Sequence, residues 1–158
     1  MSSTLVDIPS QARMSPVPAD AFIAAVCDRE FDAMQRLLAP DVRMRAVLPS
    51  RYLEAVGEEV LGCFQHWFGT AERFEVIDAG SHNVAGTARV QWRFRAAPHP
   101  LTGTPGWYEI EQIAFCDTRA GSIARIDLVS SGYRPVPPAC VRSCWPARAA
   151  SPSPQEKT

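Results

Sequence analysis

The segment from Leu53 to Phe68 constrains the fold of this chain more than any other. Its large apolar residues recur at steps of three and four, which is the spacing of one face of an α-helix. They are Leu53, Val56, Val60, Leu61, Phe64, Trp67 and Phe68. The other face is polar, and Gly69 is a typical helix stop. A helix with such a stripe has to bury it, so this pattern predicts a long helix packed against a second layer.

Two shorter helices are predicted before it. The first begins near Ala19 and turns Phe22 inward, and the second carries the apolar residues of 31–38 and ends at Pro40. Residues 42–48 are predicted to form a short strand, closed by Pro49.

After the long helix, the pattern changes to the period of two that marks strands. Residues 73–78 alternate weakly and lead to a predicted turn at 79–81, whereas 89–95 alternate clearly between apolar and polar residues. Two further strands, 107–116 and 123–131, are separated by a turn around Gly121. The order predicts an α+β fold in which a curved antiparallel sheet wraps around the long helix as a cone, with a ligand cavity at its open end.

Composition separates one domain from two tails. Residues 18–135 are expected to form the domain, while 1–17 and the Pro-, Ala- and Ser-rich 136–158 are expected to be mobile, although Cys140, Val141 and Trp145 could dock on the domain or on a partner. The five cysteines, Cys144 included, show no disulfide framework, and no segment has the length of a signal or membrane helix. We therefore expect a cytoplasmic protein. A net charge of −1 argues against nucleic-acid and membrane partners.

The order of elements resembles the nuclear-transport-factor-2-like superfamily over about residues 19–134. The matching pieces are REFDAMQRLLAPDVRM, GEEVLGCFQHWFG and IAFCDTRAGSIARIDLV. The superfamily includes ketosteroid isomerases, SnoaL-like polyketide cyclases, scytalone dehydratase and limonene epoxide hydrolase. The resemblance implies the cone fold, but it does not imply one reaction, since the same fold serves unrelated chemistries.

The acid–base groups of the ketosteroid isomerases are missing. Registering the motifs places Phe22, Ala46 and Gln112 where those enzymes have a tyrosine and two aspartates. Of the three, Gln112 alone can still donate a hydrogen bond to an oxyanion. In the SnoaL-like pattern an acid follows the last turn, and here Asp127 follows Gly121 one residue short of that spacing, so it faces outward unless a bulge restores it.

Gln112 is the leading candidate for the site, either as a ligand contact or as a satisfied core amide. It shares a strand face with Tyr108, Ile110, Ala114 and Cys116. Tyr108 either transfers a proton at the rim or packs with its hydroxyl in water. Glu109 and Glu111 look like an acid–base pair, but ion pairs with Arg93 and Arg95, or a dimer face, explain them as well.

His66 neighbours the apolar stripe, where it is either a base that reaches the cavity or a packing residue. His82 and His99 fall in predicted loops, and no histidine spacing suggests a metal site. We therefore predict four catalytic candidates, Gln112, Tyr108, His66 and Asp127, with no metal and no cofactor.

Apolar side chains are predicted to line the cavity, although the same rings would also make an ordinary core. They are Phe22, Met44, Ala46, Phe64, Trp67, Trp92, Phe94, Ile110 and Cys116. Such a wall suits a polyketide- or terpenoid-like molecule. The sequence thus favours a homodimeric enzyme of the cyclase, isomerase, dehydratase or epoxide-hydrolase kind. A non-catalytic binding or assembly module of the same fold is the alternative.

Overall fold

A computed structural model describes residues 18–138 of the 158-residue chain. The predicted tail 1–17 and the residues Cys140, Val141, Cys144 and Trp145 lie outside the described residues. The mobility of the tails and their boundaries therefore stay predictions.

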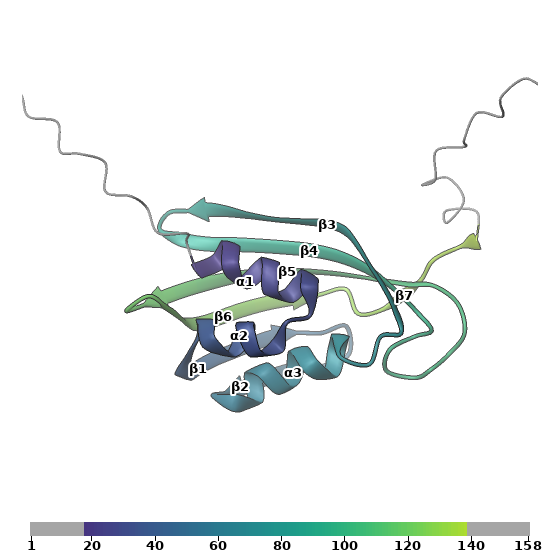
Figure 1. Cartoon of the computed structure of the whole chain (residues 1–158), viewed down its shortest axis with the longest axis horizontal. Helices are drawn as coiled ribbons and strands as arrows, with labels where there is room; N and C mark the ends of the chain where they lie inside the picture. The colour runs from purple at the N-terminus through teal and green to yellow at the C-terminus, as the bar shows by residue number, and fades with distance from the viewer. Residues whose placement is uncertain (1–17, 139–158) are drawn as a thin grey trace, which may run out of the picture.

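Three helices pack on one side of a large sheet (Figure 1). The helices are α1 (Pro18–Asp28), α2 (Phe31–Leu37) and α3 (Glu58–Phe68). The strands are β1 (Leu38–Val47), β2 (Tyr52–Val56), β3 (Arg73–Val84), β4 (Thr87–Ala97), β5 (Tyr108–Arg119), β6 (Ser122–Ser130) and β7 (Arg134–Pro135). The expected α+β class with three helices is confirmed.

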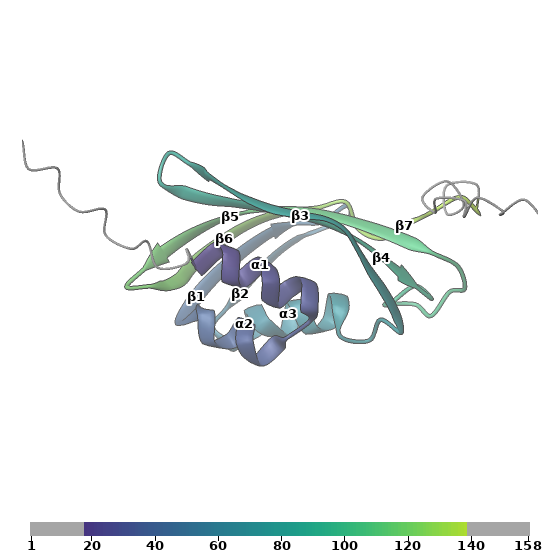
Figure 2. The same ribbon diagram turned by 45° about the horizontal axis from the view of Figure 1, so that its top comes forward.

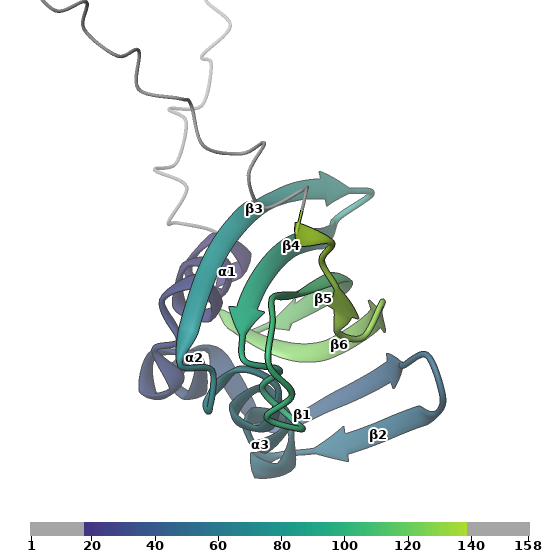
Figure 3. The ribbon, with the colours of Figure 1, turned by 90° about the vertical axis from the view of Figure 1, so that its right-hand side faces the viewer.

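The sheet is curved around the helices. Its strand order is β2-β1-β6-β5-β4-β3, and β7 pairs with β5. Figure 2 shows the strands arching over α1, α2 and α3, and Figure 3 shows the sheet bending from β3 at one edge to β2 at the other. One expectation needs correction, because β1 and β6 run parallel and the sheet is therefore mixed. The parallel pairing is possible because α3 and four strands separate β1 from β6 along the chain.

The predicted long helix is shorter than its apolar stripe. Residues 52–56 form β2, which pairs antiparallel with β1, and the helix begins only at Glu58. Gly57 separates the two with a φ of +62°, a left-handed conformation that no helix continues through. Leu53 and Val56 lie on opposite faces of β2, so their helical spacing was coincidental and their assignment to the helix was wrong.

Two other predicted boundaries were also wrong, because residues with a local stop or turn signal belong to strands of the sheet. β1 starts at Leu38 and runs through Pro40, which lies at an interruption of the β1–β6 register, so this proline does not remove a needed hydrogen bond. The predicted turn at 79–81 lies inside β3, and the chain reverses instead at Ala85 and Gly86, with φ of +51° and +85°. Two consecutive positive φ values suit the tight turn of a twisted hairpin.

The core lies between the concave face of the sheet and the helices. Phe22 from α1, Phe64 and Phe68 from α3, and Trp92 and Phe94 from β4 are all almost fully buried. Phe64 contacts Phe22 with ring centroids 5.6 Å apart and Trp92 at 6.2 Å. This interlocked aromatic cluster holds the two layers together. Within residues 18–138, no helix is both long enough and apolar enough to span a membrane.

Candidate functional site

A row of three polar side chains crosses the concave face of the sheet at its centre. Trp92, Gln112 and Ser130 come from β4, β5 and β6, and the strand register places them side by side. Trp92 Nε1 donates to Gln112 Oε1 at 2.9 Å, and Gln112 Nε2 donates to Ser130 Oγ at 3.1 Å. The backbone N–H of Gly132 also donates to Ser130 Oγ, at 3.1 Å. Gln112 and Ser130 are therefore partnered as well as buried.

Two donor hydrogens of this row remain unused. Gln112 Nε2 carries two hydrogens and donates one, and the Ser130 hydroxyl accepts twice without donating to another described residue. Apolar side chains surround both groups, where water competes little for a hydrogen bond. The row therefore has hydrogens left to donate to a ligand oxygen, the kind of interaction that stabilises a carbonyl or a developing oxyanion.

The predicted apolar wall lies together around this row. Phe22, Met44, Ala46, Phe64, Trp67, Trp92, Phe94, Ile110 and Cys116 are all buried in the core cluster. Burial raises the pKa of the Cys116 thiol to about 12, so this cysteine stays protonated and acts as an apolar group. The rings fill the space between sheet and helices, so a ligand that reaches Gln112 has to displace some of them.

Tyr108 lies at one end of this interior, in a cluster that the sequence analysis missed. Its half-buried ring contacts His99, with centroids 4.6 Å apart, and His99 contacts Tyr133 at 5.2 Å. Tyr133 donates its hydroxyl to the carbonyl of Trp67 at 2.8 Å, and burial raises its pKa, so it remains a neutral donor. His99, Tyr108 and Tyr133 thus form a partly exposed rim beside the aromatic core.

His99 is held in a defined orientation within that rim. Its Nδ1 accepts the backbone N–H groups of Leu101 and Thr102 at 3.1 and 3.2 Å, which places its own ring hydrogen on Nε2. The sequence placed His99 in a loop, and only the Pro98–Gly106 excursion brings it back over β5. Ser130 was missed too, although its period-two spacing from Ile126 and Leu128 was a usable signal.

The other two catalytic candidates lie away from Gln112. His66 is exposed on α3, on the side that the buried stripe leaves free. Asp127 is on the outer face of β6, because it alternates with the buried Ile126 and Leu128; the register shift between β5 and β6 at Ala124 does not turn it inward. The four candidates therefore do not form one cluster, and their catalytic roles stay predictions.

Asp127 is paired with two arginines. Its carboxylate contacts Arg45 Nε at 2.7 Å and Arg125 Nε at 2.9 Å. The hydrogen bond from Arg45, more than any other influence, holds the pKa of this carboxyl below its usual range. An anionic Asp127 accepts hydrogen bonds but is a weak proton donor near neutral pH.

We expect replacement of Arg45 by alanine to raise the pKa of Asp127 back toward its ordinary value. Because the folded-state pKa is depressed, the pair contributes stability above the unfolded pKa, and that stability is lost as pH falls through the folded pKa. An NMR titration of the Asp127 carboxyl carbon measures the shift. Arg119→Ala is the control, since Arg119 pairs with Asp41 instead. A titration midpoint that Arg45→Ala leaves unmoved contradicts the assignment.

Other predicted features fall on the outer face as well. Of the proposed cross-strand ladder, Arg95 and Glu109 form an ion pair at 2.9 Å, whereas Glu111 is exposed. In the described part of the chain, no group of three His, Cys, Asp or Glu residues is placed to hold a metal ion.

Comparison with known families gives a match over most of the chain. Residues 19–126 match the family model described as a SnoaL-like domain. No curated protein sequence matches the chain.

Solved structures share the fold at low sequence identity. A candidate polyketide cyclase from Xanthomonas campestris pv. campestris aligns with a TM-score of 0.55 and 18% identity, over 71% of this chain and 86% of the other. A candidate SnoaL-like polyketide cyclase from Jannaschia sp. CCS1 gives 0.56 and 17%, over 77% and 91%. A protein of ketosteroid isomerase-like fold from Catenulispora acidiphila, solved with trimethylamine, gives 0.56 and 17%, over 75% and 88%.

Proposed function

The chain belongs to the SnoaL-like domain family, and from that premise we propose that it is a cofactor-independent enzyme acting on a small hydrophobic molecule between the curved sheet and its helices. The observation that carries this proposal is the pair of unused donors at Gln112 and Ser130 inside an aromatic shell. A buried donor pair of this kind is what a reaction through an oxyanion requires.

The proposed substrate carries a carbonyl or epoxide oxygen on an apolar, polyketide- or terpenoid-like frame. Its oxygen accepts hydrogen bonds from Gln112 and Ser130, and its frame replaces part of the contact among Phe22, Phe64 and Trp67. Two structural neighbours are themselves candidate polyketide cyclases, which supports this choice of substrate class.

Tyr108 is the proposed proton-transferring residue, with His99 as its neighbour at the rim. Both rings are half buried, so this end of the interior is the proposed route of access for the substrate. His66 and Asp127 would take part only if a ligand extended beyond the concave face, and we give them no role in this step. A cytoplasmic location also stays a prediction.

A binding module without catalysis is the second candidate, and one observation favours it. Among the described residues, Gln112 and Ser130 are the buried polar side chains, and neither titrates in the physiological range. The interior then binds a carbonyl compound but moves no proton.

Mass spectrometry of small molecules extracted from the purified full chain tests the proposal. We expect a hydrophobic carbonyl- or epoxide-bearing compound with the wild type and with Glu111→Gln, and loss of it with Gln112→Leu. Glu111 is the matched control because it is exposed on the opposite face of β5. Conversion of the isolated compound by fresh protein indicates an enzyme, and unchanged compound indicates a binding module. No such compound, or equal retention by all three proteins, rules out the proposed site.

The predicted homodimer has a candidate surface on the outer face. Exposed apolar residues from four strands adjoin there, with Val47 in register with both Tyr52 and Val129, and Phe115 beside them. An apolar patch of this kind on a sheet face is typical of an interface between copies.

We expect the wild type to be a dimer by light scattering and Val129→Glu to be a monomer, because a buried unpaired carboxylate is costly. Val84→Glu is the control, since Val84 is equally apolar and exposed but lies at the far end of β3. A monomeric wild type, or a dimer that survives Val129→Glu, contradicts the predicted interface.

A further inference from the structure

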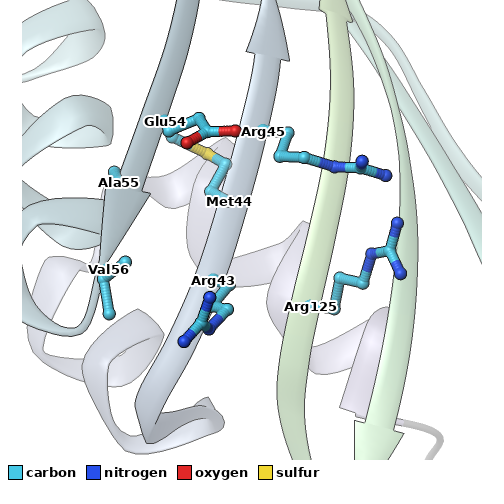
Figure 4. Close-up of a pocket in the computed structure, with 7 residues that line it drawn as sticks. All are labelled: Arg43, Met44, Arg45, Glu54, Ala55, Val56 and Arg125. Carbon is cyan, nitrogen blue, oxygen red and sulfur yellow. The ribbon is translucent and has the colours of Figure 1, made fainter.

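A cavity on the outer face of the sheet is lined by three arginines, in a region that no part of the proposed reaction uses. It has a volume of about 230 Å³ and lies over β2, β1 and β6. Arg43 and Arg45 come from β1, Arg125 from β6, and Glu54 and Val56 from β2 (Figure 4). The cavity is separated from Gln112 by the thickness of the sheet, because these residues alternate with buried ones along each strand.

The strand register places two of these positive charges against each other. Arg43 and Arg125 are partners in the parallel pairing of β1 with β6. Arg125 is already paired with Asp127, whereas no ion pair with the described residues offsets the charge of Arg43, so an anion bound in the cavity would offset that charge. The neighbour of Arg43 on the other side is Val56, which has no charge to offset it.

Nearby carboxylates pair with only some of the N–H groups of these arginines. Asp127 uses its two oxygens on the Nε atoms of Arg45 and Arg125, at 2.7 and 2.9 Å. Glu54 accepts the hydroxyl of Tyr52 at 2.7 Å. Asp117 lies in register with Arg125 on β5, but its carboxylate accepts the Thr87 hydroxyl at 3.0 Å.

Donors therefore remain open around the cavity. Arg43 makes no hydrogen bond or ion pair with the described residues 18–138, and Arg125 uses only its Nε. Figure 4 shows Arg45 and Arg125 directing their guanidinium groups toward one another on the β6 side, while Arg43 stands nearer to Val56. A planar guanidinium with free N–H groups binds the two oxygens of a carboxylate or phosphate in a forked geometry.

We propose that this pocket binds a small oxyanion, a carboxylate or phosphate group, through Arg43 and Arg125. Both groups share the chemistry that the arginines recognise, and the cavity volume limits the ligand to a small molecule. The apolar side chain of Val56 at its edge accommodates a short carbon chain on the anion. This site is independent of the reaction proposed for the concave face.

Titration of the full chain with inorganic phosphate and, separately, with butyrate tests the proposal. In low-salt buffer, with NMR detection, we expect saturable shifts of the backbone signals of Ala55 and Val56 with at least one of the two anions. The anion whose titration saturates at the lower concentration shows whether the pocket prefers a phosphate or a carboxylate. Arg43→Gln should weaken binding about tenfold or more, since it removes a charge-assisted donor.

Two further variants separate a built pocket from general surface charge. Arg125→Gln should weaken binding as Arg43→Gln does, whereas Arg36→Gln, on the exposed side of α2, should leave it unchanged. Thermal unfolding confirms that each variant is folded. Equal weakening in all three variants, or no saturable shift with either anion in the wild type, overturns the proposal. A concentration-dependent shift spread over the whole surface overturns it as well.

Discussion

Replacement of Phe64 by alanine should lower the free energy of unfolding by about 3–5 kcal/mol, which is typical for deleting a fully buried phenylalanine. Phe64 has no exposed surface, and its ring contacts Phe22, Trp67, Phe68 and Trp92. It is the ring through which α1, α3 and β4 meet. Its loss removes apolar contact area and leaves a cavity that the surrounding rings fill only in part.

Urea denaturation followed by circular dichroism measures this loss. Leu101→Ala is the control, because Leu101 is a large apolar residue that is exposed in the loop after β4. We expect that variant to stay within about 0.5 kcal/mol of the wild type. A loss of less than about 1 kcal/mol for Phe64→Ala would mean that the interior is not closely packed around this ring.

Replacement of Gln112 by alanine should reduce kcat by about 10²–10³ on the substrate identified by extraction, the usual effect of removing one oxyanion donor. In the proposed reaction the rate depends on the unused Nε2 hydrogen of Gln112, whereas its other two hydrogen bonds serve the fold. Ser130→Ala should reduce kcat in the same direction, because it removes the neighbouring donor. Steady-state kinetics on both variants measures these effects.

Stability has to be measured on the same Gln112 variant. Loss of the Gln112 amide leaves the buried Trp92 Nε1 without an acceptor, which lowers the free energy of unfolding by about 1–3 kcal/mol. Assays well below the unfolding temperature therefore separate the two roles. Glu111→Gln, on the outer side of β5, is the control and should keep its rate. A kcat within twofold of wild type for a folded Gln112→Ala would eliminate the oxyanion role and leave Gln112 as a core amide.

The concave-face residues could be predicted because a strand has a strict period of two. Once β5 was recognised, Ile110, Gln112 and Cys116 had to share one face, and the structure confirms that all three are buried together. Asp127 was expected to face outward unless a bulge restored it; it does face outward, although the β5–β6 register shifts at Ala124 before it. The nine apolar wall residues followed from similar periodicity, and all are buried.

Predictions failed where pairing with another strand overrides a local sequence signal. Leu53 and Val56 fit the helical stripe, but pairing of 52–56 with β1 outweighs the local preference, since Gly57 interrupts the helix. In the same way Gly80 suggested a turn, yet residues 79–81 pair with 90–92 of β4 and continue the strand. Local sequence signals contain no information about the hydrogen bonds that a segment makes with another strand.

By itself, the sequence determined the layers of this protein and the side chains that each layer buries, because those depend on spacing along single elements. Only the tertiary structure decided which residues meet: Ser130 beside Gln112, His99 beside Tyr108, and Arg43 beside Arg125. The first and third pairs join different strands, and the second depends on how the loop after β4 folds back over β5. The third also depends on a parallel register that no local pattern encodes. Contacts between strands are set by the folding of the whole sheet, which is why the site's neighbours could not be read from the sequence.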